Sequence, residues 1–153
     1  SHPSIRPSIS TVPSGIPSMS LKPSSSSPPS TYWSSLDWKL RGKSINGKAE
    51  EYYGVSVSLS ADGKILAIGG PGNFDGVGGQ VVVYGWDEDV LDYIQLWQVV
   101  TGVTYGELFG QSVALSADGK MLAIGAIHND DNGFKSGKVN TYRWDEADLN
   151  YKQ

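Results

Sequence analysis

The sequence contains no cysteine among its 153 residues, which excludes disulfide bridges, thiolate metal ligands and cysteine nucleophiles. It also lacks any run of about 18 apolar residues, the minimum for a membrane-spanning helix, so no direct membrane insertion is expected. No apolar period of about 3.6 residues extends beyond a turn or two, and amphipathic helices are therefore not expected.

Histidine and positive charge are both scarce. The chain has two histidines, His2 and His128. A nucleophile–base pair requires histidine or cysteine close to serine, and His128 has no recurring partner, so we expect no enzyme. Two of the twelve lysines and arginines, Arg6 and Lys22, lie in the first 30 residues, which leaves ten against sixteen Asp and Glu over the rest of the chain. This acidic balance, without a basic cluster, argues against nucleic-acid binding.

Residues 1–30 differ in composition from the rest of the chain. They hold seven of the eight prolines and twelve serines but no acidic residue, and such a segment buries too little apolar surface to offset the entropy of ordering. We therefore predict a disordered Pro/Ser-rich stalk or linker over residues 1–32 and a folded region over residues 33–153. An O-glycosylated stalk and an unmodified flexible linker both fit this composition. Because the chain opens with Ser1 rather than Met, we expect a processed product or a piece of a longer protein.

The most informative pattern is an internal repeat. Residues 53–69 return as residues 109–125 after a shift of 56 without a gap, and residues 81–93 recur in part after a shift of 58. The predicted repeats are about 54–109 and 110–153. Self-similarity at such a period is typical of stacked supersecondary units.

Each repeat reads as four short strands. In the first strand, Val55, Val57 and Leu59 alternate with serines, so one face is large and apolar while the other is small enough for a neighbouring sheet to approach closely. Asp62-Gly63, repeated 56 residues later, is a hairpin turn signal. The second strands are continuously apolar, which predicts burial on both faces. The other predicted strands are 65–68, 80–86 and 92–100 in the first repeat and 121–124 and 138–144 in the second.

Four antiparallel strands per repeat define a β-propeller blade. The predicted fold is therefore all-β, with two four-stranded antiparallel blades of an incomplete β-propeller preceded by the disordered tail. Residues 38–41 match the fourth strand of the first repeat and are predicted to be the fourth strand of a preceding blade. Two blades do not close a ring and would leave apolar sheet faces open. We therefore expect further blades from the same parent chain or self-association.

The landmarks of this repeat resemble the FG-GAP repeat, the blade unit of the integrin α-subunit propeller. An aromatic-Gly pair opens the first strand of each copy, as Tyr53-Gly54 and Phe109-Gly110. The triplets Gly69-Gly70-Pro71 and Gly125-Ala126-Ile127 end the second strands, and the blades resemble the variant that reads Leu-Ser-Ala-Asp-Gly-Lys and then Leu-Ala-Ile-Gly. The first copy has Tyr for Phe and Gly for Ala, and the second has Ile for Pro. The resemblance covers residues 38–153 and implies a secreted or cell-surface protein whose propeller closes with about seven blades.

The resemblance also implies a place to look for calcium. Many FG-GAP blades carry a loop of the form Asp-x-Asx-x-Asp-Gly-x-x-Asp between the first and second strands. Here that connection has one carboxylate per copy, in residues 60–64 and 116–120, whereas calcium takes six to eight oxygens, so we expect these turns to be structural. The remaining calcium candidate is the run Asn129, Asp130, Asp131 and Asn132. Asx–Gly clusters also form ordinary turns, and both interpretations stay open.

The long connections between strands are the expected place for a ligand. Connections in an antiparallel blade alternate between two rims, which places residues 42–53, 71–79, 101–109 and 127–137 together, opposite the short Asp-Gly and Trp-Asp-Glu turns. Variable loops on a rigid scaffold are where recognition usually occurs. The ligand-binding candidates, all expected to be exposed at this rim, are Asn73, Asp75, Tyr105, Glu107 and Phe134.

These observations favour a non-catalytic extracellular or cell-surface recognition or adhesion module that binds protein or glycan through its long loops. Two alternatives stay open. One is a structural component of a cell wall or matrix. The other is an intracellular scaffold of the WD-repeat type, because a Ser-x-Asp-Gly-Lys turn and a strand ending in Trp-Asp are also similar to that family. Its usual period of about 40–45 residues argues against this second alternative.

Overall fold

The computed structural model of the chain describes residues 38–72 and 78–153. Within them, residues 39–153 form one compact unit. The Pro/Ser-rich segment of residues 1–32 lies outside the described part, so its disorder and its glycosylation stay predictions.

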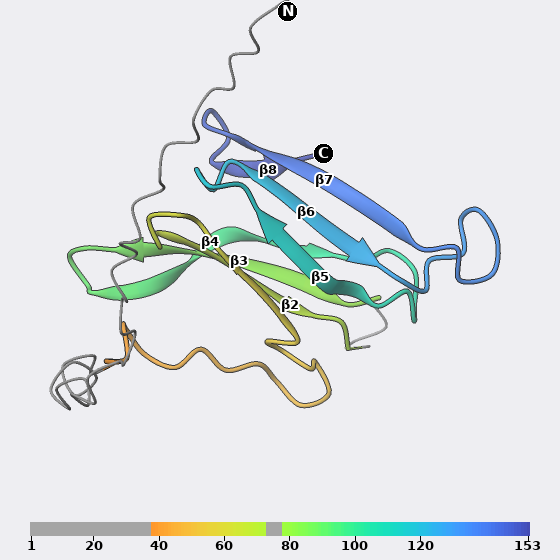
Figure 1. Ribbon diagram of the computed structural model, residues 1–153, viewed down its shortest axis with the longest axis horizontal. Coiled ribbons are helices and arrows are strands. Elements are labelled where there is room, and N and C mark those ends of the chain that lie inside the picture. The colour runs from red at the N-terminus through yellow and green to blue at the C-terminus, as the bar shows by residue number, and fades with distance from the viewer. Residues whose placement is uncertain (1–37, 73–77) are drawn as a thin grey trace, which may run out of the picture. The chain divides into compact units, whose positions relative to one another are not determined.

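The described residues form eight strands and no helix (Figure 1). The first blade comprises β1 Ser56–Leu59, β2 Ile65–Gly70, β3 Gln80–Asp87 and β4 Asp92–Thr101. The second blade comprises β5 Phe109–Leu115, β6 Met121–Ala126, β7 Lys138–Asp145 and β8 Asn150–Lys152. In each blade the strands pair antiparallel with their neighbours in chain order. The prediction of two four-stranded antiparallel blades is confirmed.

The Ser-Ala-Asp-Gly-Lys turns join the first two strands of each blade. In the first blade the Ser60 hydroxyl donates to Asp62 Oδ1 at 2.6 Å and accepts a hydrogen bond from Ile65 N at 2.9 Å. Gly63 has a φ of 69°, in the left-handed region that favours glycine. The second blade repeats both bonds 56 residues later. The predicted hairpin turns are confirmed, and their polar side chains hold the turn closed.

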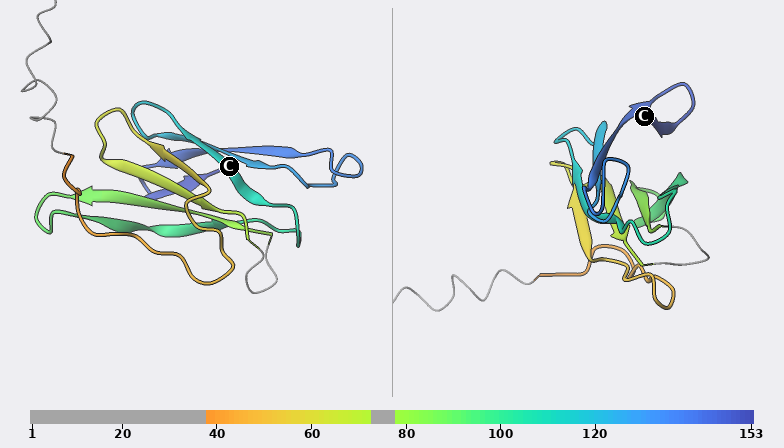
Figure 2. Two further views of the ribbon diagram at one scale, coloured as in Figure 1. Left: turned by 60° about the horizontal axis from the view of Figure 1, so that its bottom comes forward. Right: turned by 90° about the vertical axis from the view of Figure 1, so that its right-hand side faces the viewer.

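The two blades lie face to face (Figure 2), and small side chains of β1 contact the second blade. Ser56 Oγ donates to Gly110 O at 2.7 Å, and Leu115 N donates to Ser58 Oγ at 2.9 Å. A Cβ atom added at Gly69 would lie 2.1 Å from Gly110 O, so the close contact requires glycine there. The close approach predicted from the small face of the first strand is confirmed.

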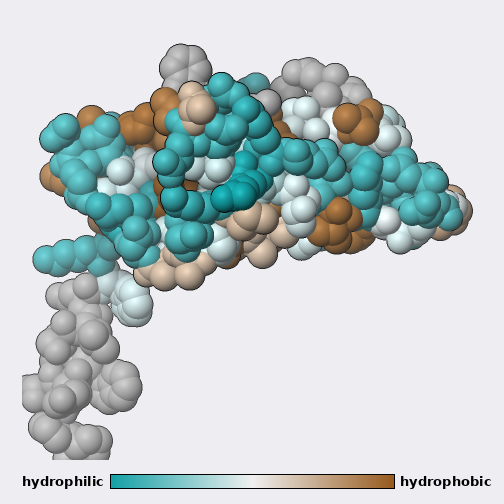
Figure 3. All heavy atoms as spheres, turned by 90° about the horizontal axis from the view of Figure 1, so that it is seen from above, coloured by the Kyte–Doolittle hydropathy of each residue, from teal (hydrophilic) through white to brown (hydrophobic). Residues whose placement is uncertain are grey.

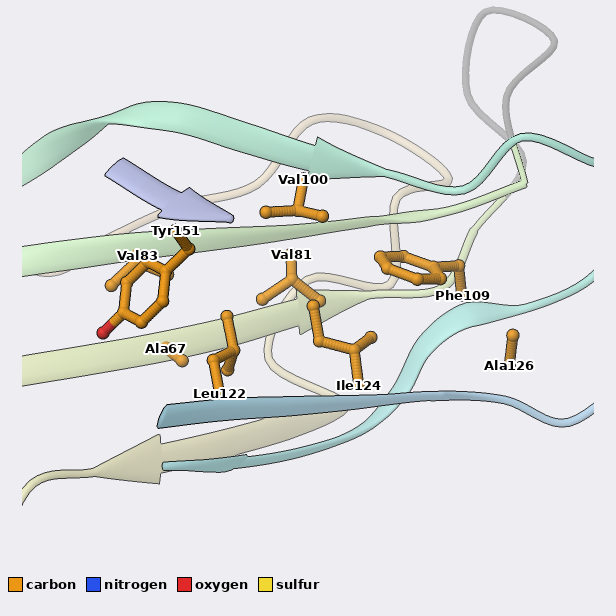
Figure 4. Packing of buried hydrophobic residues seen from close by; sticks show 9 residues of the cluster. All are labelled: Ala67, Val81, Val83, Val100, Phe109, Leu122, Ile124, Ala126 and Tyr151. Atoms are coloured by element: carbon orange, nitrogen blue, oxygen red, sulfur yellow. The ribbon is translucent and has the colours of Figure 1, made fainter. Parts of the chain in front are cut away.

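The hydrophobic core lies between the blades (Figure 4). Leu122 and Ile124 of β6 are each 1% exposed, and Val81 and Val83 of β3 are 0% and 2% exposed. Full burial of one such aliphatic side chain contributes roughly 1.5–3 kcal/mol, so this layer is the main source of cohesion between the blades. The other buried members of the cluster are Ala67, Val100, Phe109, Ala126 and Tyr151.

The outer faces of the two blades are open in part, although Ile68 and Val82, in register with Val57 on the first blade, are only 6% and 5% exposed. Val57 and Leu59 of the first blade are 62% and 54% exposed, and Met121 and Val139 of the second are 45% and 70% exposed. Apolar side chains accordingly lie among polar ones at the surface (Figure 3). The prediction that the second strand is buried on both faces is wrong for β6, because within the described residues no further sheet covers the face that carries Met121.

Residues 38–41 are not a strand, contrary to the prediction. A fourth strand needs the ladder of a third strand beside it, and no strand of the described residues pairs with this segment. Side-chain contacts hold it instead. The Arg41 guanidinium lies 4.0 Å from the centroid of the Trp86 ring, and Lys43 Nζ lies 3.6 Å from Asp92 Oδ2.

Candidate functional site

Backbone hydrogen bonds tie the described parts of the long loops together at one end of the blades. The bonds are Gly72 N to Glu51 O, Gly102 N to Gly79 O and His128 N to Glu107 O, with lengths of 3.1, 2.9 and 3.0 Å. Each bond joins two different loops. We call the described loop residues 49–53, 71–72, 78–79, 101–108 and 127–137 the long-loop rim, and the turns at the opposite strand ends the short-turn rim.

The segment 42–53 does not lie wholly at the long-loop rim, contrary to the prediction. Lys43 N donates to Asp92 Oδ1 at 2.9 Å, and Asp92 begins β4 at the short-turn rim. The other end of the segment reaches Gly72 through Glu51 O. The segment therefore runs from one rim to the other, and only its last residues belong to the candidate binding surface.

A buried carboxylate holds the second blade's part of the long-loop rim. Glu107 is 2% exposed and Asn129 is 1% exposed. Glu107 Oε1 accepts hydrogen bonds from Val103 N at 2.8 Å and Thr104 N at 3.3 Å, and its Oε2 accepts one from Asn129 Nδ2 at 2.8 Å. A buried carboxylate is costly to leave unpaired. The Glu107–Asn129 clamp therefore fixes the loops before β5 and after β6 against each other.

Glu51 takes the same position in the first blade. It is 4% exposed and accepts a hydrogen bond from Lys48 N at 2.6 Å. The residues that follow the two glutamates, Tyr52 and Leu108, have φ of 49° and 57°, a conformation that costs a non-glycine residue about 1 kcal/mol. The same bond and the same strain in both copies identify Glu51 and Glu107 as loop-positioning residues. The sequence could have shown this equivalence, because the pattern Glu-x-aromatic-Gly recurs after 56 residues.

Two of the predicted ligand-binding side chains are exposed at the long-loop rim. Tyr105 is 70% exposed and Phe134 is 85% exposed. Val103 and Tyr52 add apolar and aromatic surface from the same loops, and Lys135 Nζ lies 5.2 Å from the centroid of the Phe134 ring. Such side chains stack on sugar rings and contact apolar protein surface at a low cost in entropy.

The other predicted ligand-binding residues have different outcomes. The prediction that Glu107 is exposed is wrong, because its carboxylate turns inward to the backbone N–H groups of its own loop and to Asn129. Glu107 therefore positions the rim. Asn73 and Asp75 lie outside the described residues and stay predictions.

The four calcium candidates lie in the loop between β6 and β7, where they have separate hydrogen-bond partners. The bonds are Asn129 Nδ2 to Glu107 Oε2, Lys135 N to Asp130 Oδ1, Lys138 Nζ to Asp131 Oδ2 and Asn132 N to Ser136 Oγ, at 2.8, 2.5, 2.8 and 3.4 Å. Within the described ranges no group of three or more His, Cys, Asp and Glu side chains is arranged to hold a metal ion. The arrangement is that of a hydrogen-bonded turn, and calcium binding stays a prediction.

Aspartates at the short-turn rim are held in their ionised form. The hydrogen bond from the Ser60 hydroxyl is the main cause that lowers the pKa of Asp62, and the bond from Ser116 does the same for Asp118. A carboxyl group with a lowered pKa is a poor proton donor or acceptor near neutral pH. These groups therefore act as turn stabilisers.

The hydroxyls of Tyr53, Tyr84 and Tyr151 make hydrogen bonds in the two blades. The hydroxyls of Tyr53 and Tyr84 are 2.8 Å apart, and burial followed by this hydrogen bond raises the pKa of Tyr53 far above its usual range. Burial raises the pKa of Tyr151 to about 12, and the Tyr151 hydroxyl donates to Gly119 O. Tyr53 and Tyr151 therefore stay neutral near neutral pH, and their hydroxyls contribute hydrogen bonds to the packing.

Residues 103–142 match the family model of the FG-GAP repeat. This stretch contains β5, β6, most of β7 and the long loop between β6 and β7, so the match lies within the second copy of the repeat and supports the FG-GAP resemblance there. No curated protein matches the chain. In the part of the chain that the structure describes, there is no helix with the length and apolarity needed to cross a bilayer.

Proposed function

We propose that this chain is a non-catalytic recognition module, displayed outside the cell or on its surface, that binds protein or glycan through the long-loop rim. The FG-GAP repeat at residues 103–142 supports a propeller-type recognition module. The observation that carries the proposal is the combination of exposed aromatic side chains, Tyr105 and Phe134, with the buried Glu107–Asn129 clamp that holds their loops.

This combination suits binding for two physical reasons. Aromatic side chains provide a large contact area while they lose little rotational freedom. Loops that are already held in place lose less entropy on binding than loops that must order first. The clamp fulfils the second condition, because Glu107 joins the backbone at Val103 to the side chain of Asn129 across two loops.

Array binding of the full chain tests the proposal. We expect wild type to bind members of a glycan or extracellular matrix-protein array, and the double variant Tyr105→Ala/Phe134→Ala to bind them at least tenfold more weakly, as is typical when aromatic contact residues are removed. The matched control is Val90→Ala, since Val90 is 58% exposed at the short-turn rim. The same loss in the control, or full binding by the double variant, would contradict a site at the long-loop rim.

A second candidate, a structural wall or matrix component, is supported by the open sheet faces. The outer face of each blade corresponds, position by position in the repeat, to the inner face of the other blade. The correspondence pairs exposed Val57 with Val113, Leu59 with Leu115, Met121 with Ile65 and Val139 with Val81. The open face of each blade therefore has the kind of side chains that contacts a neighbouring blade. Either further blades of the same parent chain or a second copy fits these faces.

Sedimentation analysis over a concentration series tests self-association. We expect wild type to associate head to tail, while Val139→Lys stays monomeric because it places a charge on the open face of the second blade. Val90→Lys, at the short-turn rim, is the control and should associate like wild type. A wild-type chain that stays monomeric at the highest concentration would exclude the second copy and leave further blades of the parent chain as the partner.

A further inference from the structure

The side chain of Arg41, from the segment before β1, is held against the first blade. The guanidinium of Arg41 lies 4.0 Å from the centroid of the Trp86 ring, and its NH1 atom donates to Gly63 O at 3.1 Å. The carboxylate of Glu88 accepts a hydrogen bond from the Trp86 indole at 3.0 Å and lies 3.3 Å from Lys64 Nζ. An aromatic face and a carbonyl oxygen thus hold one planar cation, and a carboxylate is hydrogen-bonded to the same indole.

The second blade contains nearly the same arrangement of side chains around the equivalent tryptophan. The rings of Trp144 and Tyr151 have centroids 5.1 Å apart at an interplanar angle of 69°, against 5.2 Å and 72° for Trp86 and Tyr93. In both blades the tyrosine hydroxyl donates to the carbonyl of the turn glycine, which is Gly119 in the second blade. The glutamate and lysine recur as well, as Glu146 and Lys120, with 2.7 Å between their charged atoms.

Among the described residues no arginine lies against Trp144, and a pocket of about 140 Å³ lies beside that ring. Ile65 and Leu96 of the first blade form one wall. The other lining residues are Asp118, Gly119, Lys120, Trp144, Glu146 and Tyr151. Ile65 packs beside Gly119, where Arg41 packs beside Gly63 in the first blade, and the rest of the space is unfilled.

We propose that this pocket binds the guanidinium group of an arginine side chain on a partner polypeptide. Trp144 and Tyr151 offer aromatic surface, Gly119 O is an acceptor, and the carboxylates of Asp118 and Glu146 outnumber the single ammonium of Lys120. The corresponding lysine of the first blade, Lys64, pairs with Glu88 at 3.3 Å without displacing Arg41. The lysine is therefore compatible with a bound guanidinium.

The chemistry selects arginine over lysine. A guanidinium is planar, stacks flat on an aromatic ring and donates several hydrogen bonds in fixed directions. An ammonium is compact and strongly hydrated, so it gains less from the ring and loses more water. The volume of about 140 Å³ is several times the ~30 Å³ of one water molecule and accommodates the four heavy atoms of a guanidinium.

The pocket is open to a partner at the short-turn rim, where Asp118, Lys120 and Glu146 are exposed. It is therefore separate from the proposed binding surface at the long-loop rim. A chain that fails to bind arrays through Tyr105 and Phe134 can still bind arginine here, and the reverse also holds. The two proposals can fail independently.

The test is a titration of the full chain with the peptide acetyl-Gly-Arg-Gly-amide, followed through the NMR signals of the tryptophan indole N–H groups. The signals of Trp144 and Trp86 are assigned with Trp144→Phe and Trp86→Phe. We expect the Trp144 signal to shift and saturate at peptide concentrations on the order of millimolar, as suits one small anchor group. The Trp86 signal should not move, because Arg41 already occupies its ring. The peptide with citrulline, which has nearly the same shape but no charge, should shift neither signal.

Three further variants use the repeat as its own control. Glu146→Gln should weaken binding roughly threefold, the size expected for one partly exposed charge contact, whereas Glu88→Gln in the first blade should leave binding at Trp144 unchanged. Arg41→Ala should make the Trp86 signal responsive to the arginine peptide. Equal shifts with the citrulline peptide, a silent Trp144 signal, or a Trp86 signal that stays silent in a folded Arg41→Ala chain would each overturn the proposal.

Discussion

The two blades contain the same strands, but opposite faces of the repeat form the contact between them. Val81 of the first blade is fully buried, whereas its equivalent in the second, Val139, is 70% exposed. The relation reverses on β1 and β5, where Val57 is 62% exposed and its equivalent Val113 packs against the core. A position in this repeat is therefore a core position or a surface position according to which side of the blade has a neighbour.

This difference separates two contributions to stability. In stacked repeats the free energy of folding is approximately the sum of a term for each unit and a term for each interface between units. The turns and the buried glutamates recur in both blades, so they contribute to the term for each unit. The core side chains contribute to the term for the interface between the two described blades. Matched substitutions at equivalent positions therefore measure each term directly.

The largest difference is expected between Val81→Ala and Val139→Ala. Loss of two buried methyl groups from Val81 should lower the free energy of unfolding by about 2–3 kcal/mol. The same change at exposed Val139 should cost less than about 0.5 kcal/mol. Urea unfolding of the two variants measures both values. Equal losses would mean that the face of the second blade that carries Val139 is covered in solution.

The buried glutamates should behave alike in both blades, in contrast to the valines. Glu107→Gln turns an acceptor into a donor opposite Asn129 Nδ2 or Val103 N, which leaves buried donors unpaired and should cost about 2 kcal/mol. Glu51→Gln should cost a similar amount, because Glu51 is equally buried and accepts from Lys48 N. Urea unfolding measures both losses, with exposed Glu50→Gln as the control. If one glutamate cost more than the other by over 1 kcal/mol, the clamp would not be a property of the repeat.

The repeat made the strands, turns and blade architecture predictable from the sequence. Periodic alternation in β1, the Asp62-Gly63 turn and the small face of Ser56 and Ser58 each express a local rule, and the structure contains all three. What the sequence did not reveal depends on neighbours far along the chain. The exposure of Met121 depends on whether another sheet lies beside it, and no local sequence pattern shows whether such a sheet is present.

The candidate site was predicted less well than the fold. Exposed Tyr105 and Phe134 follow from their position in long loops. Its place in a long loop predicts an exposed Glu107, because charged side chains usually are exposed, whereas three hydrogen-bond donors compensate its burial. The place of Arg41 over Trp86 was also not predicted, because a match to a fourth strand favoured backbone pairing over a side-chain contact.

The burial of Tyr151 in the second blade predicts a pH dependence. Its pKa is raised from about 10 in the unfolded chain to about 12 in the folded one, so the folded state favours the protonated phenol. The contribution to stability is complete below about pH 10 and is lost as pH rises toward 12. Wild type should therefore lose roughly 1–2 kcal/mol more than Tyr151→Phe between pH 10 and pH 12. Urea unfolding at several pH values measures this, and parallel curves for the two chains would contradict it.

The smallest difference is expected between two equivalent serines. Ser56 Oγ donates to Gly110 O at 2.7 Å across the blade interface, while Ser112 lies on the outer face of the second blade and is exposed. Ser56→Ala removes the donor to a buried carbonyl and should lower the free energy of unfolding by about 1 kcal/mol. Ser112→Ala should change it by less than about 0.3 kcal/mol, because water replaces the lost hydroxyl contacts. If Ser112→Ala proved as costly in urea unfolding as Ser56→Ala, the serine face of the second blade would itself be in an interface. The serine pair therefore tests, with a polar contact, the same asymmetry that the valine pair tests with an apolar one.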